Sequence, residues 1–206
     1  MSFCRTEAET SGMFDPEPDG ATPLAPDDAA ALIPSHLTTR AELNAWEQTN
    51  ILEAVRWVAT ARSPALSTAT IRTLHQRMFG KTWEWAGRYR RVDTNIGVPW
   101  ETIGVAVENF VEDGRFWLEN RVYSIDEAAA RLHHRLVKIH PFPNGNGRHA
   151  RLWTDLLLRQ SGRENFEWGR SLDSDGDERQ AYIQALRAAD SEEFDPLLTL
   201  LLSGRT

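Results

Sequence analysis

The sequence predicts a mainly α-helical fold, a helical bundle that carries at most one small β-hairpin. Three observations support this class. Apolar residues recur every three or four positions through most of the chain after about residue 35, which is the spacing of helices with one buried face. Ser or Thr followed three residues later by Glu marks helix starts at Thr39 and Ser124. Alternation of apolar and polar residues, typical of strands, is confined to short pieces around Val92 and Ile96.

The N-terminal segment differs in composition from the rest of the chain. Residues 1–34 are rich in Pro, Gly, Asp and Glu, which favours an extended or partly disordered arm. Residues 35–206 are enough for one domain with its own hydrophobic core. We therefore expect a single domain preceded by a short arm.

The first expected helix spans about residues 38–62, and the second spans about 67–79. The apolar positions of the first helix are Leu43, Trp46, Ile51, Val55 and Val58. Between residues 80 and 100, aromatic residues, Gly and Pro predict a loop or a small hairpin. Pro141 ends a helix, because proline cannot continue the helical hydrogen bonds. The later expected helices are 101–120, 124–139, 147–160, 177–189 and 193–203.

Charge and composition exclude several classes of function. The net charge of −7 argues against non-specific nucleic-acid binding, which depends on neutralising phosphates with Lys and Arg. The one cysteine, Cys4, cannot build a disulfide framework or a cysteine metal site. No apolar run approaches 18 residues, and the N-terminus lacks the pattern of a signal peptide. We therefore expect a cytoplasmic protein without a membrane partner.

The most informative stretch runs from His140 to Arg151. A helix ends, a tight turn follows, and a new helix begins near Gly147. The start of a helix presents unpaired N–H groups and a positive dipole end, so it binds anions and phosphates in particular. Gly145 and Gly147 allow a ligand to approach the backbone closely, and Asn146 between them carries a side-chain amide donor.

Two arginines and one histidine complete this chemistry. Arg148 and Arg151 are three residues apart, which places them on about the same helical face. Two guanidinium groups beside a helix start suit an oligophosphate better than a single carboxylate. His140 lies at the opposite edge of the turn, and an imidazole can accept a proton near neutral pH. The set is what transfer of a phosphoryl-type group to a hydroxyl requires.

Residues 140–151 resemble the signature of Fic-domain proteins, His-x-Phe-x-Asp/Glu-Gly-Asn-Gly-Arg-x-x-Arg, and Asn144 is the departure from it. The stretch KTWEWAGRYR followed by NIGVPW is similar to the Trp-Ala-Gly segment and flap of this family. The resemblance covers about residues 38–190 and is closest to the subset of short Fic proteins called mobile mystery protein B. It implies a Fic-like helical bundle with a small β-hairpin flap.

The resemblance also implies an activity, a protein adenylyltransferase that moves AMP from ATP to a Ser, Thr or Tyr hydroxyl of a target protein (AMPylation). His140 would be the general base, and Phe142 would point into the core and fix the loop. Gly145, Asn146 and Gly147 would form the anion hole around the α- and β-phosphates. Arg148 would contact the β-phosphate region, and Arg151 would hold the γ-phosphate. The flap, here Ile96, Gly97, Val98 and Pro99, would align an extended target segment by strand-like pairing.

Asn144 bears on the metal. In the family, an acidic residue at this position holds Mg²⁺, the cofactor expected with ATP. Asn supplies a neutral carbonyl oxygen, which is a weaker ligand for this hard cation. Two alternatives stay open: the metal is held mainly by the phosphates of ATP, or this chain uses another donor and catalyses another reaction.

The resemblance further implies a means of inhibition. Many Fic proteins carry a helix with Ser/Thr-x-x-x-Glu-Gly/Asn, whose Glu pairs with the second signature arginine. Residues 49–54 resemble this motif with Ala54 at its last position, so Glu53 is the expected inhibitory residue and Arg151 its partner. Thr38 and Glu42 have the same spacing, but helix capping accounts for them better.

Two other classes of function stay open. One is a kinase-like or phosphocholine-type transferase that uses the same loop with another donor. The other is a non-catalytic, nucleotide-binding regulatory module of toxin–antitoxin type. The sequence does not identify the target protein, the base of the nucleotide or the oligomeric state, and a homo-oligomer is among the options.

Overall fold

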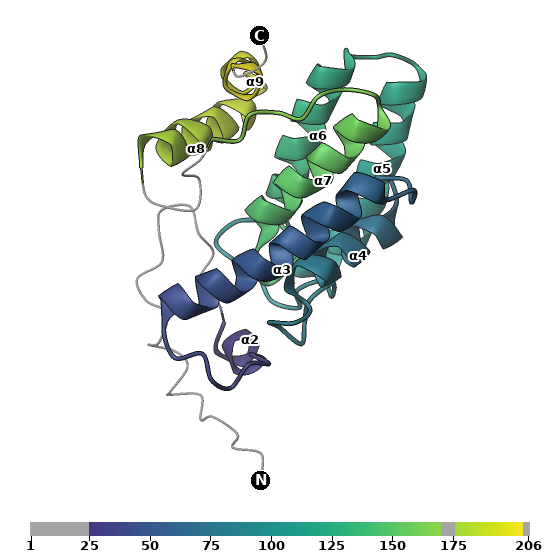
Figure 1. Cartoon of the computed structure of the whole chain (residues 1–206). Helices are drawn as coiled ribbons and strands as arrows, with labels where there is room; N and C mark the ends of the chain where they lie inside the picture. The colour runs from purple at the N-terminus through teal and green to yellow at the C-terminus, as the bar shows by residue number, and fades with distance from the viewer. Residues whose placement is uncertain (1–24, 170–175, 204–206) are drawn as a thin grey trace.

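The computed structural model describes residues 25–169 and 176–203, and in these residues the chain is mainly helical (Figure 1). The predicted fold class is therefore confirmed, and the helices from residue 40 onwards begin and end within a few residues of their expected bounds. Their bounds are α2 Pro26–Ala30, α3 Arg40–Thr60, α4 Thr68–Phe79, the 3₁₀ helix η1 Trp100–Thr102, α5 Ile103–Glu119, α6 Ile125–Ile139, α7 Asn146–Gln160, α8 Asp177–Ala189 and α9 Asp195–Leu202.

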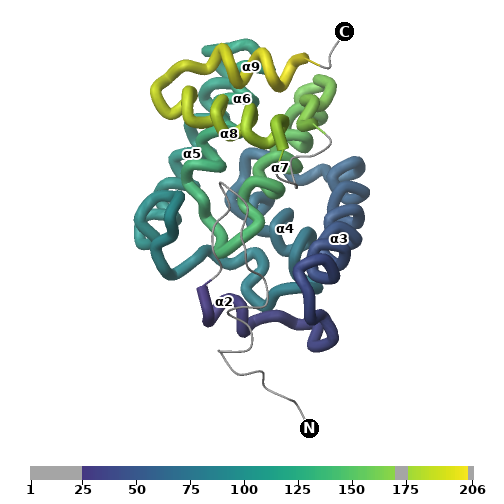
Figure 2. The backbone as a smooth tube through the Cα atoms, turned by 90° about the vertical axis from the view of Figure 1, so that its left-hand side faces the viewer, coloured from purple at the N-terminus to yellow at the C-terminus, as the bar shows by residue number. Residues whose placement is uncertain are grey.

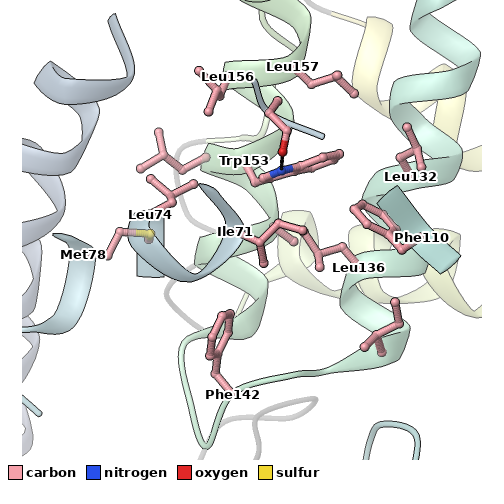
Figure 3. Packing of buried hydrophobic residues seen from close by; sticks show 14 of the residues in the cluster. Ile71, Leu74, Met78, Phe110, Leu132, Leu136, Phe142, Trp153, Leu156 and Leu157 are labelled. Carbon is pink, nitrogen blue, oxygen red and sulfur yellow. Dashed lines mark hydrogen bonds between the residues drawn. The ribbon is translucent and has the colours of Figure 1, made fainter. Parts of the chain in front are cut away.

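Helix α7 lies at the centre of the bundle, where it contacts α6, α3 and α4 (Figure 1). Helix α5 packs against α6, and α8 and α9 pair at one end of the molecule, where α9 also contacts α6 (Figures 1 and 2). Figure 3 shows the core between these helices, in which Trp153 is fully buried and donates from Nε1 to the carbonyl of Ala65 at 2.9 Å. Fully buried side chains around it are Ile71, Leu74, Met78, Phe110, Leu132 and Leu156. The core thus fixes the directions of α6 and α7, which the loop 140–146 joins.

The capping residues account for where two of these helices begin. The Thr39 side chain accepts from the N–H of Glu42, and the Glu42 carboxylate accepts from the N–H of Thr39, so the predicted capping box of α3 is complete. The Ser124 side chain accepts from the N–H of Glu127 and caps α6. These local contacts satisfy N–H groups that have no partner within the helix.

The predicted N-terminal arm is wrong for its last ten residues. In residues 25–34, the N–H of Ile33 donates to the carbonyl of Thr82 at 2.8 Å, and Trp85 Nε1 donates to the carbonyl of Asp28 at 2.9 Å. Leu32 also forms a β-bridge with Trp83. These contacts with distant residues hold the segment to the domain despite its Pro and Asp content. Residues 1–24 lie outside the described residues.

The apolar pattern of α3 matches its buried face only in part. The buried positions are Leu43, Glu47, Asn50, Ala54 and Val58. Val55, which the apolar pattern assigned to the core, is 43% exposed. Two polar residues lie on the core-facing side because each has a specific partner there, so hydrophobicity alone does not reveal the orientation of this helix.

The predicted hairpin is wrong too. Across residues 91–99, which the structure describes in full, bends replace strands, and no strand pairing forms. Gly97 has φ +127°, a conformation that interrupts an extended strand, and Pro99 lacks the N–H that a strand ladder needs. None of the described helices combines the length and apolarity that a membrane span requires.

Candidate active site

The loop 140–146 reverses the chain between two central helices. Helix α6 ends at Ile139, and His140 takes the left-handed conformation with φ 52°, which is uncommon outside glycine. Gly145 is also left-handed, with φ 77°, and α7 starts at the next residue. The loop therefore places His140 and the N-terminus of α7 at its two ends, as the sequence predicts.

The side chain of Asn146 closes this loop from within. Its Oδ1 accepts from the N–H of Phe142 at 2.9 Å, and its Nδ2 donates to the carbonyl of Phe142 at 2.8 Å. Asn146 is buried, and both ends of its amide are thus used. The expectation that this amide donates to a phosphate is therefore corrected. The backbone N–H of Asn146 lies in the first turn of α7, where N–H groups lack helical acceptors.

Phe142 and His75 hold the loop from the core side. Phe142 is fully buried, and its ring stacks on that of His75 with centroids 3.8 Å apart. His75 Nδ1 accepts from the N–H of Gly87 at 3.0 Å, so the hydrogen of the neutral ring is on Nε2, which donates to the carbonyl of Asn144 at 3.1 Å. Burial holds the pKa of His75 well below its usual value, and the charges of His149 and Arg148 act in the same direction.

His75 was not singled out in the sequence. It follows Leu74 on a helix whose apolar residues face the core, and a lone histidine there has no motif to mark it. Its role becomes visible only when α4 and the loop 140–146 are brought together.

The two glycines of the loop have different roles. A Cβ at Gly145 would lie 2.6 Å from the ring of Phe79, so both packing and backbone conformation require glycine there. A Cβ at Gly147 would meet no protein atom within 4 Å. The space beside Gly147, at the first turn of α7, is thus open to a ligand.

His140 is in the protonation state that a general base needs. Its Nδ1 lies 3.2 Å from the carbonyl of Val137, and because a carbonyl only accepts, Nδ1 carries the ring hydrogen. Burial lowers the pKa of His140 to about 4; the Val137 contact raises it and the charge of Arg90 lowers it further. The imidazole is therefore neutral at pH 7, with its lone pair on Nε2. His140 is only 7% exposed.

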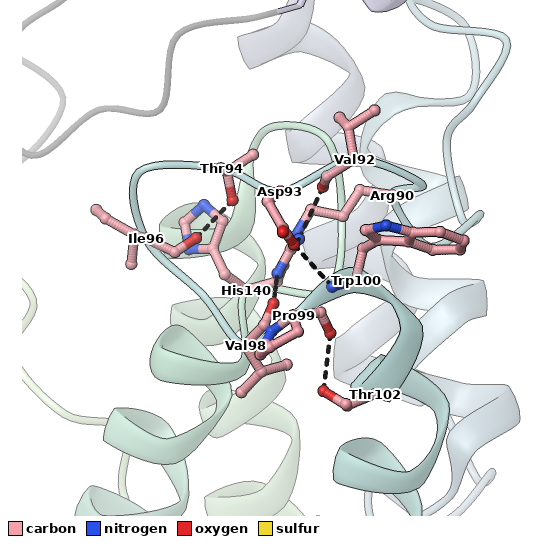
Figure 4. A network of polar contacts seen from close by, with 10 residues as sticks. All are labelled: Arg90, Val92, Asp93, Thr94, Ile96, Val98, Pro99, Trp100, Thr102 and His140. Atoms are coloured by element: carbon pink, nitrogen blue, oxygen red, sulfur yellow. Dashed lines mark hydrogen bonds and ion pairs between the residues drawn. The ribbon is translucent and has the colours of Figure 1, made fainter.

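The flap lies directly against His140, although it is not a hairpin. The N–H of Val98 donates to the carbonyl of Ile139 at 3.4 Å, and a Cβ at Gly97 would lie 2.9 Å from His140 Cβ. Figure 4 shows Ile96, Val98 and Pro99 around the histidine, together with Arg90. The sequence did not single out Arg90, because nothing local indicates that its side chain is buried.

Arg148 and Arg151 both lie at the start of α7 but have different surroundings. Arg148 lies over the ring of Phe79, with 4.9 Å between its Cζ and the ring centroid, and pairs with Glu47 on α3. Arg151 lies on the side of Asp155 and Tyr182. Burial raises the pKa of Asp155 to about 6 and that of Tyr182 to about 12, and the charge of Arg151 lowers both values. Arg148 thus lies on the side of α7 that faces α3, and Arg151 lies on the side that faces α8.

The acidic partner of this site is Glu47 rather than Glu53. Glu47 Oε2 accepts from Arg148 Nη1 at 2.6 Å, and Oε1 accepts from Trp83 Nε1 at 2.7 Å. Glu53 pairs instead with Lys81 at 2.6 Å, and its side chain is 50% exposed. The predicted contact between Glu53 and Arg151 is therefore corrected. The core-facing side could have been indicated by the helical spacing of three or four residues that joins Leu43, Glu47, Asn50 and Ala54.

The residues of the loop do not fit a protein-built magnesium site. Asn144 Oδ1 accepts from the N–H of Gly145 at 2.6 Å, so the one side-chain oxygen that the signature offers is turned back on its own loop. Across residues 25–169 and 176–203, no three His, Cys, Asp or Glu side chains gather as a metal site would need. Mg²⁺ prefers charged oxygen ligands, which the loop 140–146 lacks.

Comparison with known proteins agrees with the geometry. The model of the Fic/DOC family matches residues 65–158. Protein adenylyltransferase fic-1 of Caenorhabditis elegans is 35% identical over 101 residues, which are 47% of this chain and only 20% of that relative. The chain therefore spans about a fifth of the length of that protein.

Solved structures share the fold. The N-terminal FIC domain of Bep8 from Bartonella sp. 1-1C superimposes with a TM-score of 0.64 at 17% identity, covering 81% of this chain and 86% of that one. BepC of Bartonella tribocorum, solved with bound AMPPNP, gives a TM-score of 0.62 at 21% identity over 80% and 87% of the two chains. The family match covers the loop 140–146, all of α6, and α7 up to residue 158. Residues 65–158 of this chain are therefore a domain of the Fic/DOC family.

Proposed function

We propose that this chain is a protein adenylyltransferase, which transfers AMP from ATP to a Ser, Thr or Tyr hydroxyl of a target protein. The observation that carries the proposal is the neutral imidazole of His140, with Nδ1 held by the carbonyl of Val137, across the turn 141–145 from the N-terminus of α7. The names of the relatives and the AMPPNP bound to BepC support it.

In this reaction His140 Nε2 accepts the proton of the target hydroxyl. The hydroxyl oxygen forms a bond to the α-phosphorus of ATP, and the bond from that phosphorus to the β-phosphate oxygen breaks, which releases pyrophosphate. N–H groups of the first turn of α7 and the guanidinium groups of Arg148 and Arg151 stabilise the phosphate charge. None of these roles requires a metal ion bound by protein side chains. Any Mg²⁺ would be held mainly by the phosphates of ATP.

The position of the label in the donor tests the reaction class. The protein is incubated with lysate and with ATP labelled at the α- or the γ-phosphate. Transfer of the α label alone, with an added adenylyl mass on the acceptor, is the expected result. Transfer of the γ label would show a kinase-like reaction and overturn the proposal. Binding of ATP without transfer of either label would favour the non-catalytic module.

We further propose that Glu47 inhibits this activity. Its carboxylate occupies Arg148, a cation that the phosphates of ATP would otherwise contact, and it is almost fully buried, with a side-chain exposure of 6%. A buried carboxylate paired with a guanidinium competes with phosphate for the same donors. Trp83 Nε1 donates to the other oxygen of this carboxylate, Oε1, and so holds it in place.

A pair of substitutions on the same helix distinguishes Glu47 from Glu53. Glu47→Gln keeps an acceptor for Trp83 but removes the charge that holds Arg148, so we expect faster labelling and tighter ATP binding. Glu53→Gln removes an exposed contact with Lys81, and we expect wild-type labelling. If labelling is faster in Glu53→Gln and unchanged in Glu47→Gln, Glu53 is the inhibitory residue, as the sequence motif predicts.

A further inference from the structure

We propose that Arg90 is a positioning residue that fixes the segment 91–99 and the catalytic histidine to one another. This inference rests on the proposed function, because it concerns how a target held by the flap meets His140. The inference is supported by the buried guanidinium of Arg90, which donates to carbonyls of residues 91–99 and to that of His140.

The contacts of Arg90 join two parts of the chain that are about fifty residues apart in sequence. Its Nε donates to the carbonyl of His140 at 2.8 Å, and its Nη1 donates to the carbonyl of Val92 at 2.8 Å. Its Nη2 donates to the carbonyl of Val98. The backbone N–H of Arg90 adds a bond to the carbonyl of Pro141 at 2.9 Å. Figure 4 shows the guanidinium between the histidine and the segment 91–99.

The chemistry of these contacts explains why arginine is needed. The side chain is only 1% exposed, and its nearest carboxylate, Asp93, lies 3.7 Å away and is 70% exposed. The charge is thus satisfied mainly by backbone carbonyls that lie in different directions. A planar guanidinium with five N–H donors can reach three of them at once, whereas the compact ammonium of lysine cannot span the same positions.

The contact with His140 has a specific consequence. His140 is held in the left-handed conformation, and its carbonyl is the acceptor of Arg90 Nε. The same guanidinium is so close to the flap that a Cβ at Gly97 would lie 2.5 Å from Nη2. A target backbone paired with the flap would therefore be placed relative to the imidazole through Arg90.

Two substitutions and one matched control test this role. Arg90→Lys keeps the positive charge but loses the planar guanidinium and its five N–H donors. Arg90→Gln removes both the charge and the guanidinium. Arg88→Gln is the control, because Arg88 is an exposed arginine two residues earlier. The measurements are the initial rate of label transfer from α-labelled ATP into lysate proteins, the KM for ATP, and hydrogen exchange of residues 91–99 against that of α4.

We expect both Arg90 variants to lower the transfer rate about 100-fold, the size of effect that a small misplacement of reacting groups produces, with the KM for ATP little changed. Exchange in residues 91–99 should rise about tenfold while that of α4 stays at the wild-type level. If Arg90→Gln does not fold, Arg90→Lys carries the test. A general loss of structure would instead raise exchange in α4 and lower the rate only through the folded fraction.

The outcomes separate this inference from the proposed function. Wild-type rates and exchange in Arg90→Lys and Arg90→Gln would overturn the role of Arg90 and leave the reaction class standing. If the wild type transfers no label, the proposed function fails, and the exchange of residues 91–99 still decides whether Arg90 fixes this segment to the loop. Equal effects in Arg88→Gln would also overturn the inference.

Discussion

The loop 140–146 and the segment 91–99 meet at His140, but different interactions hold them in place. The loop is held from the buried side by Asn146 and His75, whose polar atoms pair with its backbone, and by the ring of Phe142, which stacks on His75. Apart from the buried Arg90, the segment 91–99 is largely at the surface, and its Val92 is 46% exposed. The loop with the proposed base is thus built into the core, while the surface proposed to receive a target is attached to it through few contacts.

This difference has a physical reason. A general base and a phosphate-binding helix start must be held closely to act, which buried and fully paired groups achieve. A surface for an extended target must leave backbone groups accessible to pairing. The loop should therefore respond to substitution with losses of stability and activity together, and the segment 91–99 with smaller losses of stability.

The largest effect is expected at the loop itself. His140→Ala removes the proposed base, so we expect the transfer rate to fall by about 10²–10⁴. His36→Ala is the control, because His36 is an exposed histidine outside the loop. The rate of transfer from α-labelled ATP is measured for both. A wild-type rate in His140→Ala would show that another group accepts the proton.

The two glycines of the loop give a matched pair. Gly145→Ala forces a Cβ to within 2.6 Å of Phe79 at a residue with φ +77°, so we expect the free energy of unfolding to fall by about 1–3 kcal/mol. The Cβ of Gly147→Ala would lie in open space, so we expect the free energy of unfolding to change by less than about 0.5 kcal/mol. The same Cβ should weaken the binding of AMPPNP. Urea unfolding and calorimetry measure the two effects. Equal losses of stability would contradict the assignment of the open space to a ligand.

Buried histidines make the core side of the site sensitive to pH. Burial lowers the pKa of His133 to about 3 and those of His140 and His149 to about 4. Below their usual value of 6.5 the unfolded chain binds protons that the folded chain does not, so stability is lost as pH falls from 6.5 toward 4.

Each of these histidines should contribute up to about 1 kcal/mol of lost stability per pH unit within this window. The raised pKa of Asp155, about 6, acts in the opposite direction and offsets part of the loss. Urea unfolding between about pH 7 and pH 5 measures the slope. A free energy of unfolding that stays level, or rises as the pH falls, would contradict the burial of these rings in neutral form.

A substitution in the flap is expected to affect stability less than Gly145→Ala does. Gly97→Ala places a Cβ against Arg90 and His140, but the surrounding segment is at the surface and can shift. We therefore expect the free energy of unfolding to fall by about 1 kcal/mol or less, with a clear drop in the transfer rate. A loss of stability as large as that of Gly145→Ala would show that the flap is part of the rigid core.

The sequence predicted the helices well because their starts and ends are encoded locally. Capping residues, Pro141 and the glycines of the loop act within a few positions of themselves, and the resemblance of residues 140–151 placed His140 and Arg148 at one site. The hairpin was predicted wrongly because short alternating pieces do not show whether a partner strand exists. The apolar pattern of α3 marked its buried face only in part, because Glu47 and Asn50 also lie on that face.

The sequence by itself determined the elements and the loop that joins α6 to α7, since these depend on contacts between near neighbours. Tertiary structure alone decided that Glu47 and not Glu53 pairs with an arginine of α7, that Asn146 closes the loop instead of pointing outwards, and that Arg90 joins His140 to residues 91–99. Arg148, the partner of Glu47, and His140, the partner of Arg90, lie about a hundred and about fifty residues away in the sequence, respectively, so only the folded chain brings them together. Asn146 pairs with the backbone of its own loop because both are buried, and an unpaired polar group there would be costly.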